Sequence, residues 1–131
     1  MHVDSFIVRN RGAPDFKTEE LWSSPTPTHY ISKRVYILVG PETFSAGEGF
    51  AYELQALKRA TIVGAKTKGG AGGNPNGPTP LGSNLFVFVP SGRAESPMTK
   101  SHWDRVGVIP DIQAAPDDAL DAAMKLALAS R

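Results

Sequence analysis

The chain has 131 residues, which suits one domain with a single hydrophobic core. Its formal net charge is +1 and no more than two Lys or Arg residues are adjacent, which argues against nucleic acid or an anionic membrane surface as a partner. The absence of cysteine excludes disulfides and thiolate metal sites, and no apolar run approaches the roughly 20 residues of a membrane-spanning helix. We expect no metal and no cofactor, and the sequence does not indicate the cellular compartment.

The N-terminal part has the weakest pattern. Residues 2–9 alternate loosely between apolar and polar side chains and predict one short strand. Residues 11–33 are polar and interrupted by proline, so we expect irregular structure there. In that segment, the side chains expected to anchor on the core are Leu21, Trp22 and Tyr30.

A strand–helix–strand unit follows. Residues 35–39 are continuously apolar and mostly β-branched, which is typical of a strand covered on both faces. A helix is expected to begin at Ser45, and residues 61–63 predict a second strand. The predicted apolar face of this helix comprises Phe50, Leu54 and Leu57. Such a βαβ unit has parallel strands and a right-handed crossover, which makes the class α/β.

The remainder opens with a stretch rich in glycine and proline, residues 64–82, that lacks apolar periodicity and predicts a long functional or disordered loop. Residues 85–89 predict a strand, and a turn leads to a short partner strand at 93–95, forming a hairpin. Residues 107–112 are expected to be extended, and a C-terminal helix is expected over 116–129. Its predicted apolar face comprises Leu120, Met124, Ala127 and Leu128.

Ser45 has two interpretations. The sequence S-A-G-E is a capping box, in which Ser45 and Glu48 satisfy each other's backbone amides at the start of a helix. Alternatively, Ser45 is a nucleophile, because a helix N-terminus beyond the carboxyl end of a parallel strand offers free amides and a partial positive charge to a developing oxyanion. A serine needs a base to take its proton, and the local sequence supplies none.

Four motifs resemble the tail-specific (C-terminal processing) serine peptidases. They are T-x-S-A-x-E at residues 43–48, a helix ending L-x-x-x-x-R-A at 54–60, V-G at 63–64 and T-x-G-G at 67–70. The likeness covers about 35–127 and is closest to the branch that includes tricorn protease and the interphotoreceptor retinoid-binding protein modules. It implies that Ser45 is the nucleophile.

The resemblance also implies a ClpP/crotonase-like β-superhelical core. We expect a single domain over residues 1–131, in which 35–131 form the family-like core and 1–34 wrap around it. Members of the family carry a glycine-rich turn and a histidine upstream of the nucleophile, and residues 1–34 match neither. The core is therefore expected to be truncated at its N-terminal side. The strand at 35–39 would then have an exposed edge that self-association into a homo-oligomer could cover.

The general base is open at this point. In the branch with a Ser/Lys dyad the lysine aligns with Gly70, which has no side chain, while Lys68 lies two positions short. In the tricorn-like branch the resemblance places the acid on Asp104, where the family commonly has glutamate. His102 could be a local base, although the family's histidine precedes the nucleophile.

These expectations favour a serine peptidase, or the catalytic fragment of one, that acts on a peptide or protein. The amide of Ala46 would form half of the oxyanion hole, and Gly69 and Gly70 would line the substrate cleft. The alternative is a non-catalytic binding module for an apolar ligand or a partner chain, as the retinoid-binding relatives imply. A crotonase-like acyl-CoA site is a third interpretation, without a clear phosphate cradle in the sequence.

Overall fold

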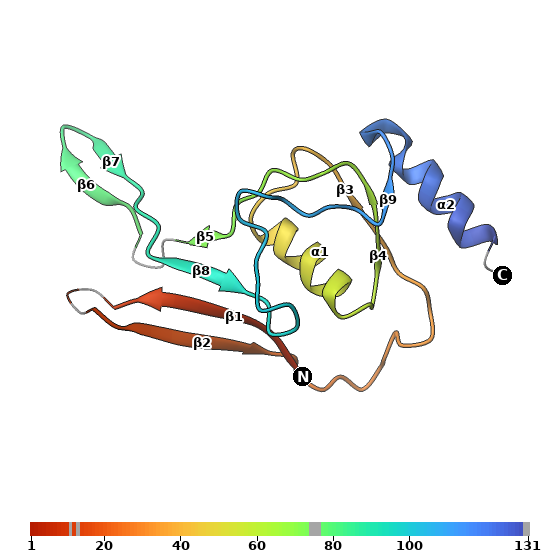
Figure 1. The fold of residues 1–131 in the computed structure, drawn as a ribbon, viewed down its shortest axis with the longest axis horizontal. Coiled ribbons are helices and arrows are strands. Elements are labelled where there is room, and N and C mark those ends of the chain that lie inside the picture. Colours follow the sequence, from red (N-terminus) through yellow and green to blue (C-terminus); the bar gives the residue numbers. More distant parts are fainter. Residues whose placement is uncertain (11, 13, 74–76, 130–131) are drawn as a thin grey trace.

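The computed structural model describes residues 1–10, 12, 14–73 and 77–129. These residues form a four-stranded sheet, a three-stranded sheet and a separate two-stranded hairpin, with helix α1 lying in the middle of the molecule and helix α2 at one end (Figure 1). The elements are β1 (His2–Arg9), β2 (Phe16–Trp22), β3 (Tyr36–Val39), α1 (Ala46–Ala56), β4 (Thr61–Gly64), β5 (Gly72–Gly73), β6 (Thr79–Gly82), β7 (Leu85–Val87), β8 (Gly92–Glu95), β9 (Ile112–Gln113), a 3₁₀ turn η1 (Pro116–Asp118) and α2 (Ala119–Ala129).

The predicted βαβ unit is confirmed. Strands β3 and β4 are parallel and are joined through α1, and β9 adds a third parallel strand, which makes the order β3-β4-β9. The extended segment expected at 107–112 thus ends in the sheet. Helix α2 contacts β3 and β4, and β3 is one of the two edge strands of this sheet, as the sequence indicated.

The N-terminal segment differs from the prediction. The strand expected at residues 2–9 is present as β1, but residues 16–22 are not irregular: they form β2, which pairs antiparallel with β1. The expected core anchors Leu21, Trp22 and Tyr30 are 61%, 57% and 66% exposed. Pairing with β1 outweighs the poor strand pattern of β2, an edge strand whose charged residues face solvent.

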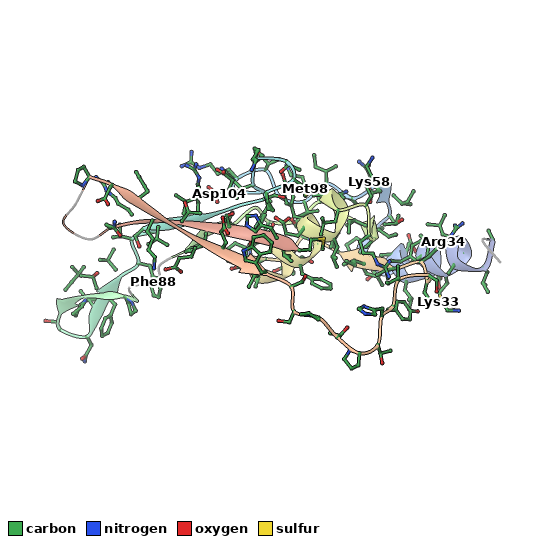
Figure 2. All side chains as sticks on the ribbon, turned by 90° about the horizontal axis from the view of Figure 1, so that it is seen from below. Lys33, Arg34, Lys58, Phe88, Met98 and Asp104 are labelled. Atoms are coloured by element: carbon green, nitrogen blue, oxygen red, sulfur yellow. The ribbon has the colours of Figure 1, made fainter. Side chains whose placement is uncertain are left out.

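The predicted hairpin of residues 85–89 with 93–95 is wrong. Strand β7 pairs instead with β6, and β8 lies between β1 and β5 in the four-stranded sheet. Ser83 and Asn84 join β6 to β7 with φ of 49° and 62°, the left-handed pair that a two-residue hairpin turn requires. The β6–β7 hairpin projects from the rest of the molecule (Figure 1). Figure 2 places Phe88 at its base.

The helices bury alanines and, in α1, two glutamates rather than their large apolar side chains. The core groups Val39, Ala51, Ile62, Trp103 and Val108 with two further alanines. The apolar faces expected from spacing are wrong for the large side chains that remain more than half exposed, which are Phe50, Leu120, Met124 and Leu128. Helix α1 instead buries Glu48, Ala51 and Glu53, and α2 buries Ala119 and Ala123. Neither helix, nor any other among the described residues, is long and apolar enough to cross a membrane.

Candidate active site

Ser45 lies in the turn between β3 and α1, beyond the carboxyl end of β3. The turn is closed by Thr43, whose amide donates to the Gly40 carbonyl at 2.9 Å and whose hydroxyl accepts from the Gly40 amide at 3.0 Å. Ser45 itself has φ 54° and ψ −118°, and its side chain is exposed. A residue with a Cβ rarely adopts positive φ, so the backbone of Ser45 is strained.

The carboxylate of Glu48 fixes this turn from below. It is fully buried and accepts four hydrogen bonds, from the Ser45 amide (2.9 Å), the Thr67 hydroxyl (2.5 Å), the Gly69 amide (2.6 Å) and the Gly70 amide (2.9 Å). Burial disfavours the charged carboxylate, but these four donors outweigh it and lower the pKa of Glu48. The Ser45–Glu48 contact of the predicted capping box is confirmed. The sequence did not predict that Glu48 also anchors the loop between β4 and β5, residues 65–71, which we call the glycine loop.

The glycine loop is tied to the core on its other side as well. The Thr67 hydroxyl accepts from the Val108 amide at 2.7 Å while it donates to Glu48. The Trp103 indole donates to the Gly70 carbonyl at 3.1 Å, and its ring packs against Gly49, where a Cβ would lie only 3.0 Å from it. The sequence analysis named Thr67 only as part of the T-x-G-G motif and gave it no role, and it did not single out Trp103, because a lone Trp carries no periodicity.

A cavity of about 460 Å³ opens beside Ser45. Its walls come from α1, from β1 and from the loop that leads into β5. The residues around it are mostly apolar or glycine, and they are Val3, Asp4, Phe6, Leu21, Ser45, Ala46, Gly49, Phe50, Glu53, Leu54, Gly70, Ala71, Gly72, Gly73, Ala94 and Trp103. The serine at the strained turn therefore faces a space large enough for a substrate side chain.

Of the two residues expected to line the cleft, Gly70 does and Gly69 lies one residue behind it. The amides of both donate to Glu48, so neither is free to bind an oxyanion. Ala46 lines the cavity as the first residue of α1, where a backbone amide has no acceptor within the helix. Ala46 therefore lies next to Ser45 on the cavity wall.

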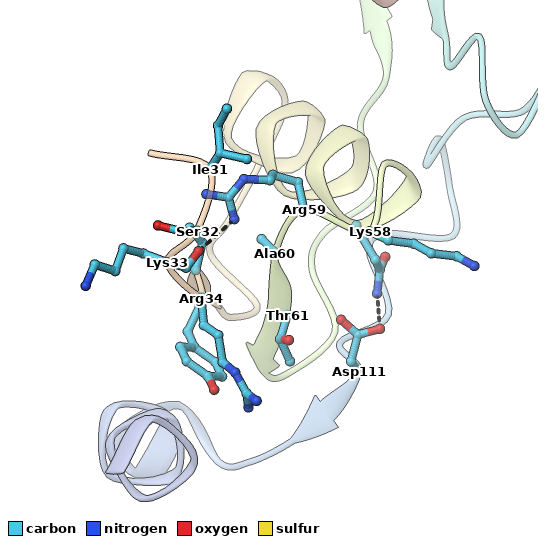
Figure 3. Close-up of a pocket in the computed structure, with 12 residues that line it drawn as sticks. Ile31, Ser32, Lys33, Arg34, Lys58, Arg59, Ala60, Thr61 and Asp111 are labelled. Carbon is cyan, nitrogen blue, oxygen red and sulfur yellow. Dashed lines mark hydrogen bonds between the residues drawn. The ribbon is translucent and has the colours of Figure 1, made fainter. Parts of the chain in front are cut away.

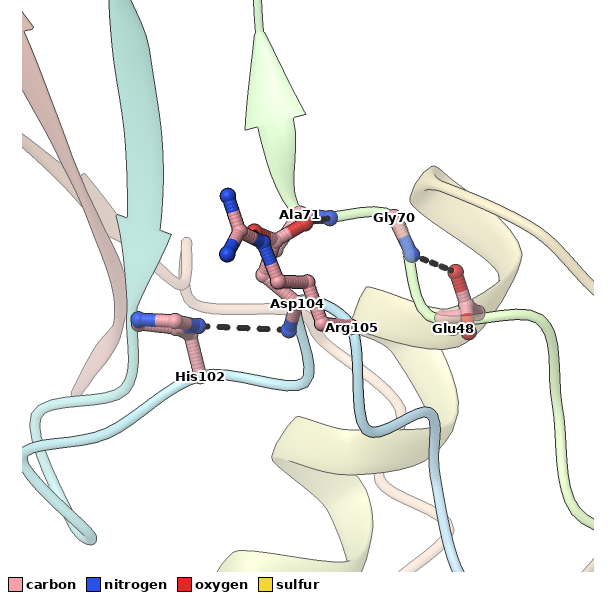
Figure 4. Close-up of polar contacts among 6 residues, drawn as sticks. All are labelled: Glu48, Gly70, Ala71, His102, Asp104 and Arg105. Atoms are coloured by element: carbon pink, nitrogen blue, oxygen red, sulfur yellow. Dashed lines mark hydrogen bonds and ion pairs between the residues drawn. The ribbon is translucent and has the colours of Figure 1, made fainter.

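Asp104 lies behind the same loop. Its Oδ1 accepts from the Ala71 amide at 3.1 Å, and its Oδ2 is 3.9 Å from the Arg105 guanidinium (Figure 4). His102 lies beside it, with Nδ1 accepting from the Asp104 amide at 3.2 Å. Asp104 thus binds the amide of Ala71, which lines the cavity, but Asp104 is not itself among the lining residues. Among the described residues, no hydrogen bond joins Asp104 or His102 to Ser45.

The candidate base Lys68, and a further basic side chain, His2, are engaged in other contacts. The Lys68 ammonium is 3.7 Å from the Glu42 carboxylate and 5.9 Å from the centre of the Phe44 ring, and its side chain is 58% exposed. The His2 ring stacks on Trp22 with their centres 5.0 Å apart. Neither side chain forms a hydrogen bond with Ser45 in the part of the chain that the structure describes.

A second hollow, of about 560 Å³, lies at the opposite end of α1 (Figure 3). It is basic, with Lys33, Arg34, Lys58 and Arg59 among its lining residues. The Arg59 guanidinium donates to the carbonyls of Lys33 and Tyr30, so it fastens the segment before β3 to the end of α1. Lys58 in its lining also has a positive φ, of 53°, but none of its described lining residues is a serine at a helix N-terminus, and we assign the hollow a structural role.

Together, fold and site define an α/β protein with an exposed serine at a helix N-terminus, anchored to a glycine loop. The sequence model of peptidase family S41 matches residues 3–114, and the chain belongs to this family. The resemblance to tail-specific serine peptidases is confirmed. The family match begins within β1, whereas the resemblance was expected to cover about residues 35–127.

Solved structures share the fold. The chain is similar to the photosystem II D1 C-terminal processing protease, with a TM-score of 0.62 and 24% identity over 88% of this chain. It is also similar to a protein of Parabacteroides merdae named as a peptidase, with a TM-score of 0.71 and 22% identity over 100% of this chain. Mature CPAF in complex with lactacystin matches with a TM-score of 0.66 and 23% identity over 79%. The chain spans 28%, 44% and 22% of these three proteins, respectively.

Proposed function

We propose that the chain carries the nucleophile and part of the oxyanion hole of a serine peptidase, and that Ser45 attacks the carbonyl carbon of a peptide bond. The observation that carries this proposal is the backbone of Ser45, held at φ 54° and ψ −118° at the start of α1 and beside the 460 Å³ cavity. Strain of this kind persists only where the surroundings enforce it, and it concentrates at functional sites. Family S41 membership supports a peptide or protein as the substrate.

The chemistry follows from the turn. The Ser45 oxygen forms a bond to the carbonyl carbon while a base takes its proton, and the carbonyl oxygen becomes an anion next to the Ala46 amide and the helix N-terminus. Collapse of this intermediate breaks the C–N bond, and the departing amine receives the proton. Water then attacks the acyl-serine in the same way, which releases the acid and restores the hydroxyl.

Two local bases are disfavoured by their contacts. His102 accepts a hydrogen bond at Nδ1, so in its neutral form the proton is on Nε2 and the accepting nitrogen is already occupied. The Lys68 ammonium lies at the surface, 3.7 Å from the Glu42 carboxylate, and forms no hydrogen bond with Ser45 among the described residues. We propose instead that an imidazole from another segment or a second copy approaches Ser45, with Asp104 as the acid that orients it.

We further propose the ClpP/crotonase-like core and a single domain over residues 1–131. The parallel β3-β4-β9 sheet beside the antiparallel sheet, with α1 in the middle, supports this arrangement (Figure 1). The exposed edge of β3 supports self-association as the source of further site residues.

A binding module for an apolar ligand is the second candidate function. One observation favours it: the cavity is mostly apolar, and no base contacts Ser45 among the residues that the structure describes. In that case Ser45 would serve only to start α1.

A fluorophosphonate probe separates the two functions. We expect the probe to label Ser45 of the full-length protein, because only an activated serine displaces fluoride from the probe and forms a phosphonate ester. Ser45→Ala should abolish the labelling, while Ser83→Ala, which changes an exposed serine in the β6–β7 turn, should leave it unchanged. Peptide mapping of the adduct checks the site. If a folded protein is not labelled at Ser45, the peptidase proposal is wrong and the binding module is favoured.

A further inference from the structure

The cavity beside Ser45 contains a buried carboxyl group that the proposed mechanism does not use. Glu53 lies two turns along α1 from Ser45 and is only 4% exposed. Its Oε2 accepts from the Ser96 hydroxyl at 2.8 Å, whereas its Oε1 has no hydrogen-bond partner among the described residues. An unpaired buried carboxyl oxygen is costly, so it indicates that a partner is supplied from outside.

A second acid lines the same cavity from the opposite wall. Asp4 of β1 is partly buried, and its Oδ1 accepts from the Ser5 amide at 2.8 Å. Burial raises the pKa of both groups. For Glu53 it reaches about 7, with the Ser96 hydrogen bond opposing the rise and the negative charge of Asp4 adding to it. The charge of His2 partly offsets the rise in the pKa of Asp4. No Lys or Arg forms an ion pair with either acid within the described ranges.

We propose that this cavity binds the substrate side chain next to the scissile bond and selects lysine or arginine, whose charged end pairs with Glu53 and Asp4. The proposal rests on the proposed peptidase function and assigns its substrate class. A cation satisfies the free Oε1 of Glu53 and offsets the repulsion between two acids, which a neutral apolar side chain cannot do.

The reach of such a side chain fits the helix geometry. Eight residues separate Ser45 from Glu53, which is about 12 Å along the axis. The Glu53 side chain leans toward the N-terminus of α1, as helical side chains do, and shortens the gap by several ångströms. The remaining span is about that of an extended lysine or arginine side chain plus one hydrogen bond.

The walls suit the stem of the same side chain. The large apolar and aromatic residues that line the same cavity as Ser45 and the two acids are Phe6, Leu21, Phe50, Leu54 and Trp103. Lysine and arginine bury their methylene groups against apolar surface while the charge binds at the end. On the side of the loop the wall is formed by Gly70, Ala71, Gly72 and Gly73, and the Phe6 ring packs directly against Gly73.

Two phosphonate probes test the selection. They are peptidyl diphenyl phosphonates that differ only at the residue next to phosphorus, lysine in one and norleucine in the other, so that they differ by the ammonium group. We expect the lysine probe to label Ser45 of the full-length protein at least tenfold faster at pH 8. Glu53→Gln should reduce this ratio to about one, and its circular dichroism spectrum checks separately that the variant is folded.

Glu42→Gln is the matched control, because it removes a carboxylate near Ser45 whose side chain is 93% exposed and outside the cavity. The ratio should not change in this variant. Equal labelling by both probes in the unaltered protein would overturn the proposal, as would a lysine preference that survives in Glu53→Gln. In both cases the proposed peptidase function would stand.

A binding measurement covers the case in which nothing labels Ser45. In Ser45→Ala, the side-chain carboxyl carbon of Glu53 is followed by NMR while n-butylammonium or 1-butanol is added. We expect the ammonium to move this resonance and to lower the pKa of Glu53, and the alcohol to do neither. Loss of labelling together with ammonium binding would refute the peptidase and leave a cation-binding pocket. No response to n-butylammonium would overturn the inference.

Discussion

Ser45 combines an exposed hydroxyl with a backbone conformation that costs energy. A residue held in a sparsely populated φ/ψ region carries about 1–3 kcal/mol of strain, and glycine adopts such regions far more readily. The strain belongs to the backbone, so it persists when only the hydroxyl is removed. Ser45 is therefore a position where function and stability are expected to conflict.

Two substitutions at Ser45 separate strain from capping. We expect Ser45→Gly to be more stable than Ser45→Ala by about 1 kcal/mol, because glycine relieves the positive φ and alanine retains it. Both variants should lose labelling. Urea unfolding of the two proteins measures the difference. Equal stabilities would mean that the turn is relaxed, and the main support for a nucleophile at Ser45 would be lost.

Helix α1 and the glycine loop act as one unit because Glu48 bonds to both. The carboxylate holds the Ser45 amide of the turn and the Gly69 and Gly70 amides of the loop. Hydrogen bonds to a charged group contribute more than neutral ones, about 1.5–3 kcal/mol each. Its loss should therefore disturb the loop and the serine together.

Glu48→Gln tests this coupling. The new amide group faces backbone N–H donors, so we expect a loss of about 3 kcal/mol or more in the free energy of unfolding and slower labelling of Ser45. Glu42→Gln, at an exposed carboxylate, should change neither. Chemical denaturation with parallel labelling measures both effects. A Glu48→Gln protein within 1 kcal/mol of the parent would contradict the coupling.

Local signals predicted the βαβ unit and the C-terminal helix, because contiguous apolar residues, a capping box and a proline at a helix start act within a few residues. The pairing of β8 with β1 and β5 was not predictable in this way, since it joins segments far apart in the chain. The burial of Glu53 was missed for a related reason: an acid in a helix is normally solvated, and only the tertiary fold places Ser96 and Asp4 near it.

For the molecule as a whole, the two buried acids of α1, Glu48 and Glu53, have opposite effects on how stability depends on pH. The pKa of Glu48 is lowered in the folded state, so its contribution is present above the ordinary value of 4.5 and is lost as the pH falls through the folded value. The pKa of Glu53 is raised to about 7, so the folded state binds its proton more tightly, and stability declines as the pH rises from 4.5 to 7.

We accordingly expect stability to be greatest near pH 5 and lower at pH 8 by an amount on the order of 3 kcal/mol from Glu53 alone. Glu53→Gln should remove most of the decline between pH 5 and pH 8, because its side chain does not titrate. Urea unfolding at the two pH values provides the measurement. A decline of equal size in Glu53→Gln would assign the pH dependence to other groups.

The four hydrogen bonds of Glu48 also bear on how this sequence can diverge. A descendant without the proposed peptidase activity could replace Ser45 with little loss of stability. Replacing Glu48 would instead release the glycine loop from α1. A duplicated copy of the chain would thus be expected to keep Glu48 after Ser45 had been replaced. In such lineages the surviving glutamate would be a record of ancestry, and only the serine would report on current use.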